Sequence, residues 1–148
     1  MRILFVCTGN TCRSPMAEVL ARSQLKALGR EDVTVSSAGA AAMEGDGATA
    51  GAREAMASRG LSLEDHRSRG LTVEMLEEAD TVIFMTRAAR DRVASIVPQY
   101  DERCVTLSRW AGAEGDVADP YGGGAAVYEQ TARQLEQWIA AGIARHLA

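Results

Sequence analysis

Short apolar runs alternate with helical segments along the whole chain, and this alternation constrains the fold more than any other feature of the sequence. Strands that alternate with helices pack as a parallel sheet. The sequence therefore predicts a three-layer, Rossmann-like α/β fold, in which a four-stranded parallel sheet carries helices on both faces. Buried strands are predicted at residues 2–6, 33–35, 81–85 and 105–107. Helices are predicted at residues 14–28, about 48–59, 72–79, 87–96 and about 125–147.

The boundaries of the first helix follow from local sequence. Ser14 is predicted to cap its N-terminus, Pro15 suits the first helical position, and Gly29 suits its end. With 148 residues, the chain fits one domain that spans 1–148. The stretches 39–51 and 110–124 are interpreted as loops of this domain. Ligands of parallel sheets bind beyond the carboxyl ends of the strands, so the loops after residues 6, 35, 85 and 107 should meet at one edge.

Charge and composition exclude several classes of function. The formal net charge is −4, so the chain lacks the broad basic surface that binding to nucleic acid requires, although a small basic pocket for a compact anion is compatible with it. No apolar run approaches the ~20 residues that span a bilayer, so no membrane partner is expected. Three cysteines make no disulfide framework and indicate a cytoplasmic protein. No spacing of His and Cys fits a zinc site, and neither a metal nor another cofactor is expected.

The loop between the first strand and the first helix carries the clearest chemistry. Cys7 ends the strand, and Arg13 follows after a spacer of five residues. The N–H groups of the loop and the positive end of the helix can form a nest for a tetrahedral oxyanion. Gly9 is expected to allow a backbone conformation that a side chain would obstruct. Arg13 adds a planar fork that matches two phosphate oxygens.

Cys7 would lie at the bottom of this nest. The dipoles and the guanidinium that attract phosphate also stabilise a thiolate, which is a nucleophile in line with phosphorus. Ser14 could donate a hydrogen bond to that sulfur and help it leave. The plainer interpretation is a buried cysteine at a strand end beside a surface arginine, because a Cys-x5-Arg spacing alone is common. The preceding strand, the capped helix and the polar loop favour the catalytic interpretation.

Two motifs resemble the low-molecular-weight protein tyrosine phosphatase family: VCTGNTCRSPMAE at residues 6–18 and DVADPYGGG at residues 116–124. The resemblance covers nearly the whole chain and implies a four-stranded parallel sheet and catalysis without a metal. It implies that Cys7 is the nucleophile that becomes phosphocysteine and that Arg13 binds the phosphoryl group. Asp119 would be the general acid and then the base. From the residues alone, Asp116 remains a competing carboxylate, because Asp-Pro pairs such as Asp119-Pro120 are common in turns.

The resemblance also implies supporting roles. Ser37 and His66 would hold the loop from behind together with Asn10 and Ser14, although His66 on its own is typical of an exposed loop histidine. Cys7 and Cys12 are a candidate redox pair, since the family can join such cysteines in a reversible disulfide; the alternative for Cys12 is a small apolar filler. Tyr121 matches the aromatic wall of the pocket. The residues expected to bind phosphate or substrate are Thr8, Gly9, Asn10, Thr11, Cys12, Ser14 and Tyr121.

Thr11 is the residue that bears on the choice of substrate. Tyrosine-directed members of the family usually carry an apolar branched residue there, whereas Thr resembles the protein-arginine phosphatase branch, as does the segment 127–131. A hydroxyl can pair with a guanidinium N–H group that an apolar side chain would leave unpaired. Tyr121 departs from that branch, which often has Phe there. The sequence therefore favours phosphoarginine in proteins as the substrate, with phosphotyrosine as the alternative.

Two further classes fit less well. The thioredoxin-coupled arsenate reductases share the loop but need further cysteines near the middle of the chain, and residues 13–103 contain none. A non-catalytic phosphoprotein-binding module would lack the nucleophile or the acid. The expected partners are a phosphorylated protein as substrate and inorganic phosphate as product, and the expected state is a monomer. Outside the loop, Cys104 is expected to be inert and His146 to be solvated.

Overall fold

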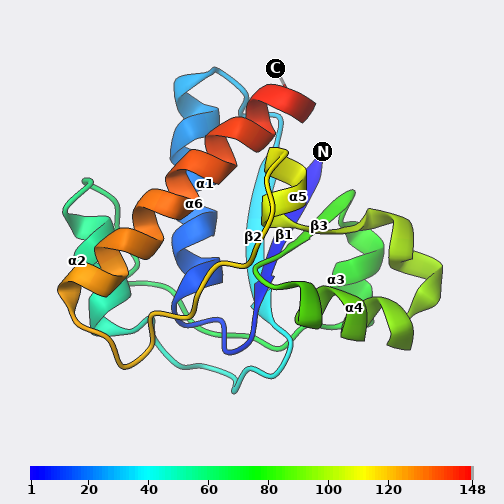
Figure 1. The fold of residues 1–148 in the computed structure, drawn as a ribbon, viewed down its shortest axis with the longest axis horizontal. Helices are drawn as coiled ribbons and strands as arrows, with labels where there is room; N and C mark the ends of the chain where they lie inside the picture. The colour runs from blue at the N-terminus through cyan, green and yellow to red at the C-terminus, as the bar shows by residue number, and fades with distance from the viewer. Residues whose placement is uncertain (148) are drawn as a thin grey trace.

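A computed structural model describes residues 1–147 and confirms the predicted class of fold. One sheet of four parallel strands has the order β2-β1-β3-β4, so the N-terminal strand lies inside the sheet. Helices cover both faces of this sheet, as Figure 1 shows. The strands are β1 (Arg2–Cys7), β2 (Thr34–Gly39), β3 (Thr81–Phe84) and β4 (Cys104–Thr106).

The two faces of the sheet are packed by alternate residues of each strand. Ile3 and Phe5 of β1 belong to the larger core, whereas Leu4 and Val6 belong to the smaller core on the opposite face. The larger core lies under α1 (Arg13–Ala27), α2 (Ala50–Ala57), α5 (Leu107–Ala111) and α6 (Ala125–His146). The smaller core lies under α3 (Val73–Glu78) and α4 (Arg87–Ile96), and a 3-10 turn (Pro98–Arg103) leads from α4 into β4.

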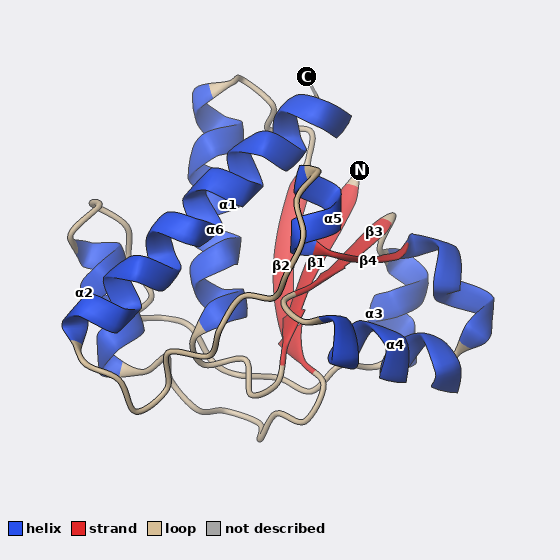
Figure 2. Cartoon of the chain, in the orientation of Figure 1, coloured by secondary structure: helices blue, strands red, loops and turns tan. Residues whose placement is uncertain are grey.

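The carboxyl ends of the strands meet at one edge, as predicted. Figure 2 shows the loops gathered along the lower edge of the sheet, where the strand arrows end. Cys7 pairs in register with Gly39 of the neighbouring strand, and its carbonyl oxygen accepts a hydrogen bond of 2.8 Å from the N–H group of Ala40. We call residues 112–124, between α5 and α6, the late loop. The N–H group of Val117 in this loop donates to the carbonyl oxygen of Met85 at 2.9 Å, which attaches the late loop to the end of β3.

The prediction for residues 105–124 was wrong in part. Residues 105–107 were expected to form a strand followed by a loop, but β4 ends at Thr106 and α5 begins at Leu107. The side chain of Thr106 caps α5 by accepting a hydrogen bond from the N–H group of Arg109. Leu107 and Trp110 are buried three residues apart, and Gly112 ends the helix at a φ of 81°. The segment 105–107 is thus divided between two elements: its first two residues end β4, and Leu107 begins α5.

The N-terminus of α1 also differs from the prediction. The helix begins at Arg13, with Cys12 and not Ser14 in the capping position, and no side chain caps it. The hydroxyl of Ser14 contacts the sulfur of Cys7 instead, so it is not available to bind a helical N–H group. A side chain that looks like a cap in the sequence is used by the strand–helix loop.

Two other expectations need correction. β2 extends to Gly39, so Ser36 and Ser37 are part of the strand and not of the loop after it. His146 is not simply solvated, because its ring stacks on Trp110 at a centroid distance of 5.3 Å and its Nε2 atom lies 2.9 Å from the carbonyl oxygen of Trp110. None of the helices within residues 1–147 combines the length and apolar character needed to cross a bilayer.

Candidate active site

The sulfur of Cys7 lies at the end of β1 and at the base of the loop 8–12. Cys7 is 4% exposed, and its thiol is not in a disulfide. The backbone N–H group of Asn10 donates to the sulfur at 3.3 Å, and the Oγ atom of Ser14 lies 2.9 Å from it. One backbone donor and one hydroxyl thus lie within hydrogen-bond distance of a buried sulfur, and donors in such positions stabilise negative charge on sulfur.

Asn10, and not Gly9, provides the unusual backbone of the loop. Asn10 has a φ of 56°, the left-handed region that asparagine tolerates better than most residues, whereas the φ of Gly9 is not positive. A Cβ atom at Gly9 would come no nearer than 3.6 Å to the hydroxyl of Thr11, an ordinary contact. The expectation that Gly9 is needed for its conformational freedom is therefore wrong. The turn depends on Asn10, whose side chain is fully buried.

A network behind the loop holds Asn10 in this conformation. Its side-chain NH2 group donates to the hydroxyls of Ser14 at 2.9 Å and of Ser37 at 3.0 Å, and its Oδ1 atom accepts from the N–H group of Arg69 at 3.0 Å. The Nε2 atom of His66 lies 2.7 Å from the carbonyl oxygen of Asn10, so this nitrogen carries the proton and donates. Ser37 and His66 thus both contact Asn10, and their role in supporting the loop stays a prediction.

Arg13 is the buried cation of the loop. The residue is 5% exposed, and its guanidinium donates to the carbonyl oxygen of Val117 at 3.0 Å. One of its terminal nitrogens lies 3.5 Å from the hydroxyl of Thr8 and 3.7 Å from a carboxylate oxygen of Asp119. The late loop is therefore attached to the loop 8–12 through this side chain.

The two competing carboxylates occupy different places. Asp119 lies beside Arg13 with a side chain that is 52% exposed, so it reaches both the loop and solvent. Asp116 instead accepts a hydrogen bond of 2.9 Å from the N–H group of Arg87 at the start of α4. A carboxylate at this position stabilises the positive end of a helix. The structure therefore brings Asp119, and not Asp116, next to Arg13.

Cys12 faces away from the strand, toward α2 and α6. Its sulfur lies 3.4 Å from the hydroxyl of Thr49 and 3.5 Å from that of Tyr128, and its thiol is free like that of Cys7. Thr49 also donates to Tyr128 at 3.0 Å, and its backbone N–H group binds the carbonyl oxygen of Thr11 at 3.0 Å. Burial of the Tyr128 phenol raises its pKa, so this hydroxyl stays protonated at neutral pH.

Thr8, Thr11 and Tyr121, which were also predicted to bind the substrate, are partly or fully exposed to solvent. Thr8 is exposed, and the hydroxyl of half-buried Thr11 lies 3.9 Å from the sulfur of Cys12. Tyr121 is 72% exposed, and its backbone N–H group donates to Asp119 at 3.1 Å. No group of three or more His, Cys, Asp or Glu side chains within residues 1–147 is arranged to hold a metal ion.

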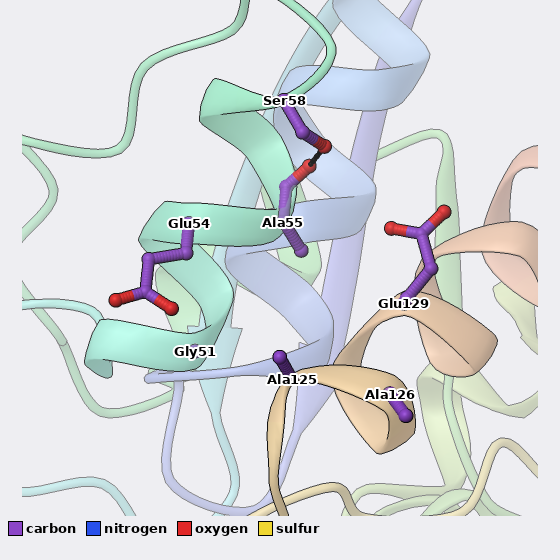
Figure 3. A pocket seen from close by; sticks show the side chains of 7 residues that line it. All are labelled: Gly51, Glu54, Ala55, Ser58, Ala125, Ala126 and Glu129. Carbon is purple, nitrogen blue, oxygen red and sulfur yellow. Dashed lines mark hydrogen bonds between the residues drawn. The ribbon is translucent and has the colours of Figure 1, made fainter.

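A cavity of about 350 Å³ lies between α2 and α6, apart from the loop. Figure 3 shows that its acidic side chains, Glu54 and Glu129, stand on different helices and do not point at a common centre. A site for a small molecule needs convergent polar groups, and this cavity does not provide them. It is lined by Gly51, Glu54, Ala55, Ser58, Ala125, Ala126 and Glu129.

Three residues near the site were not singled out from the sequence. Glu18 accepts a hydrogen bond of 2.6 Å from Ser37, and Thr49 and Tyr128 bind Cys12 as described. Thr49 carries a detectable signal, because a threonine just before a helix is typical of an N-cap, and its side chain does cap α2. Glu18 and Tyr128 lie on helices in positions that the sequence pattern cannot distinguish from ordinary polar and core positions.

Fold and site together define a three-layer α/β protein with a cysteine at the base of an anion-binding loop. The chain belongs to the family described as low molecular weight phosphotyrosine protein phosphatase, whose model matches residues 2–146. The family predicted from the two sequence motifs is thereby confirmed.

Several relatives cover almost the whole chain. A protein-arginine-phosphatase of Bacillus subtilis is 44% identical over 140 residues, which are 94% of this chain and 92% of that protein. A structure of YwlE arginine phosphatase, a C7S mutant with a phosphorylated active site serine, superposes with a TM-score of 0.93 at 40% identity and covers 98% of this chain and 95% of its own. A low molecular weight protein tyrosine phosphatase from T. tengcongensis gives a TM-score of 0.94 at 42% identity, covering 98% and 99%.

Proposed function

We propose that this protein hydrolyses phosphoarginine in proteins through a phosphocysteine intermediate. The observation that carries the proposal is the buried sulfur of Cys7, which receives the N–H group of Asn10 and the hydroxyl of Ser14 in the loop that Arg13 closes. Such a loop attracts a phosphoryl group and places it next to the sulfur that attacks it. The relationship to a protein-arginine-phosphatase at 44% identity supports the choice of substrate.

In the first step, the thiolate of Cys7 attacks phosphorus while the bond between phosphorus and the guanidine nitrogen breaks. Asp119 gives its proton to the departing nitrogen, so arginine leaves neutral at that atom. The guanidinium of Arg13 and the N–H groups of residues 8–12 bind the phosphoryl oxygens as charge shifts onto them. The carbonyl oxygen of Val117 holds the guanidinium in place at 3.0 Å.

In the second step, Asp119 takes a proton from a water molecule, whose oxygen attacks the phosphorus of the phosphocysteine. The bond between sulfur and phosphorus breaks, and inorganic phosphate is released. Ser14, whose Oγ atom lies 2.9 Å from the sulfur, stabilises the departing thiolate. The half-exposed side chain of Asp119 is accessible to the water that this step needs.

Thr11 supports phosphoarginine as the substrate. The departing guanidine carries several N–H groups, and these groups need acceptors when the substrate is bound. Thr11 lies in the loop beside the buried Cys12 and is half-buried, so its hydroxyl is placed to accept such a group. An apolar branched side chain in the same place would pack against a phenol ring instead.

Phosphotyrosine is the second candidate substrate. The observation that favours it is the tyrosine phosphatase of T. tengcongensis, which is 42% identical over nearly the same length. Tyr121 is also exposed at the rim, where a ring could stack on a second ring. Both substrates would use the same nucleophile, and only the leaving atom differs.

The test compares kcat/KM on matched phosphoarginine and phosphotyrosine peptides, for the wild-type protein and for Thr11→Ile. We expect the wild type to prefer phosphoarginine and Thr11→Ile to lose about tenfold or more of that preference, since one unpaired N–H group costs about 1–3 kcal/mol. Thr8→Ala, at the exposed neighbouring threonine, is the matched control and should keep the preference. A wild-type preference for phosphotyrosine would overturn the choice of substrate and leave the mechanism in place.

The proposal also includes the setting of the enzyme. The chain acts as a single domain and a monomer in the cytoplasm, where the phosphorylated protein binds and inorganic phosphate leaves. The low count of three cysteines supports a reducing compartment. Cys12 is the candidate redox partner of Cys7, and it would have to turn away from Thr49 and Tyr128 to form that disulfide.

A further inference from the structure

We propose that Glu18 is a positioning residue for Cys7, acting through a directed chain of hydrogen bonds that runs through Ser37, Asn10 and Ser14. The chain of contacts is continuous from the carboxylate to the sulfur, with distances of 2.6, 3.0, 2.9 and 2.9 Å. The inference deepens the proposed function, because it takes Cys7 as the nucleophile. It concerns how the proton of Ser14 comes to face the sulfur.

The direction of these hydrogen bonds is set at the side-chain amide of Asn10. The backbone N–H group of Arg69 can only donate, and it lies 3.0 Å from the Oδ1 atom of Asn10. The amide oxygen is therefore committed to Arg69, and the NH2 group must face the two serines. Both hydrogens of that group are used, one toward each serine oxygen.

Each serine hydroxyl accepts a hydrogen bond from Asn10 and then has one proton of its own to donate. Ser37 already accepts from Asn10, so its proton goes to the Oε1 atom of Glu18 at 2.6 Å. Ser14 also accepts from Asn10, so its proton is free for the sulfur at 2.9 Å; the carbonyl oxygen of Ala38 is the poorer alternative at 3.4 Å. The sulfur of Cys7 thus receives the proton of Ser14, because the contact of Arg69 with Oδ1 keeps the Asn10 amide from turning that oxygen toward Ser14.

Glu18 matters because Ser37 is buried, with an exposed fraction of 3%. Among residues 1–147, the carboxylate is the acceptor that the structure gives to the proton of this hydroxyl. Without an acceptor there, the buried proton would be unsatisfied, and every remaining orientation of the hydroxyl would either leave it so or bring it closer to the NH2 group of Asn10. In the second case two donors would face each other, and the amide that orients Ser14 would be displaced.

Arg22 fixes the carboxylate from the other side. Its guanidinium donates to the Oε2 atom of Glu18 at 2.8 Å and to the carbonyl oxygen of Val35 at 2.9 Å, while Ser37 uses Oε1. The side chain of Glu18 is only 20% exposed. The other charged or titratable groups that face the chain of contacts are Arg13, Cys12, His66, Arg69 and Asp119.

The experiment uses Glu18→Gln, because Arg22 decides how a glutamine would lie. Arginine only donates, so it would draw the amide oxygen of the glutamine and leave the NH2 group facing Ser37. Ser37 would then receive two donors, and its own proton would have no acceptor. In the double variant Glu18→Gln with Arg22→Ala, the glutamine is free to turn its oxygen toward Ser37 and restore the original direction.

The readout is the alkylation of Cys7 by iodoacetamide as a function of pH, followed by mass spectrometry. This reaction reports the thiolate directly and needs no phosphatase activity, so it remains informative if the proposed function fails. Cys7 and Cys12 share one tryptic peptide and are distinguished by fragmentation. Burial raises the pKa of the Cys104 thiol, so Cys104 stays unlabelled in any variant that remains folded.

We expect the midpoint of Cys7 alkylation to rise by about 0.5–1 pH unit in Glu18→Gln, because a weakened hydrogen bond to the sulfur disfavours the charged form. Arg22→Ala alone should leave the midpoint unchanged, and the double variant should return most of the way to the wild type. Ser14→Ala, which removes the last donor, gives the upper limit of the effect. The pH profile of kcat/KM on a phosphorylated peptide should move in the same direction.

Two results would overturn the inference. If Glu18 acted only through its charge, its removal would favour the thiolate and the midpoint would fall. If Glu18 were only part of the packing, the single and double variants would show the same midpoint, without recovery. A protein with the expected midpoints but no phosphatase activity would overturn the proposed function and leave the role of Glu18 in place.

Discussion

At the scale of single residues, Asn10 determines the shape of the loop. A left-handed residue is needed at the turn, and glycine would supply it without any contacts. Asparagine supplies the same backbone and also three side-chain contacts, to Ser14, Ser37 and Arg69. The loop therefore gains its conformation and its hydrogen-bond direction from one side chain. A sequence shows the asparagine, but it does not show which residue of the loop has a positive φ.

The two aspartates of the late loop give the first prediction. Asp119→Asn should lower kcat by about 10²–10³-fold on a phosphoarginine peptide, because an amide neither gives nor takes the proton. Asp116→Asn is the matched control, since Asp116 only faces the first turn of α4. It should keep kcat and lose about 0.5–1 kcal/mol of stability through the weaker interaction with the helix dipole. Steady-state kinetics and urea unfolding of both variants measure these effects.

The assignment of the acid would be contradicted by the reverse pattern. A variant Asp119→Asn that turns over like the wild type, together with an inactive but folded Asp116→Asn, would identify Asp116 as the acid. That outcome would also require the late loop to leave its contact with Arg87 during the reaction.

At the scale of elements, Arg59 ties the end of α2 to α6. Its guanidinium lies 2.7 Å from Glu129 and 2.9 Å from Glu136, and its side chain is only 16% exposed. Glu129 also lines the cavity shown in Figure 3, while Thr49 and Tyr128 join the same two helices beside the loop. The two helices that flank Cys12 are thus held at both ends of α2.

This tie predicts a pH dependence of stability. Hydrogen bonding to Arg59 lowers the pKa of Glu129 from its ordinary value of 4.5. A carboxyl whose pKa is lowered on folding contributes stability above the unfolded pKa and loses it as the pH falls through the folded pKa. The loss of stability in Arg59→Met should therefore be larger at pH 7 than at pH 3, measured by urea unfolding at both.

Arg133→Met is the matched control for this prediction. Arg133 lies 3.4 Å from the same carboxylate, but its side chain is 71% exposed, so the pair is screened by solvent. Its removal should change stability little at either pH. An effect of Arg59→Met that is equal at pH 7 and pH 3 would show that packing, and not the ion pairs, ties α2 to α6.

At the scale of the whole molecule, the alternation of strands and helices was sufficient to predict the sheet and its active edge. The apolar runs at residues 2–6 and 81–85 placed the loops that follow β1 and β3, because parallel strands bring all their carboxyl ends to one side. Local rules failed where a tertiary contact uses the same side chain. Ser14 looks like a cap but contacts Cys7, and Leu107 looks like strand but begins the helix that Thr106 caps.

The site was predictable in its motifs and not in its connections. Cys7, Arg13 and Asp119 lie in two segments that resemble the family, so their proximity could be expected. The contacts of Glu18 with Ser37 and of Tyr128 with Cys12 join residues 19 and 116 positions apart. Such pairs depend on how helices cross the sheet, and no local pattern of the sequence encodes them.

The central claim is that the sulfur of Cys7 takes the phosphoryl group from the substrate. The most direct measurement mixes the wild-type protein with a phosphoarginine peptide, quenches the reaction in denaturant during turnover and locates the phosphoryl group by mass spectrometry. The account predicts a phosphoryl group on Cys7 while the peptide is turned over. Turnover of the peptide without any phosphoryl group on Cys7 would contradict the account.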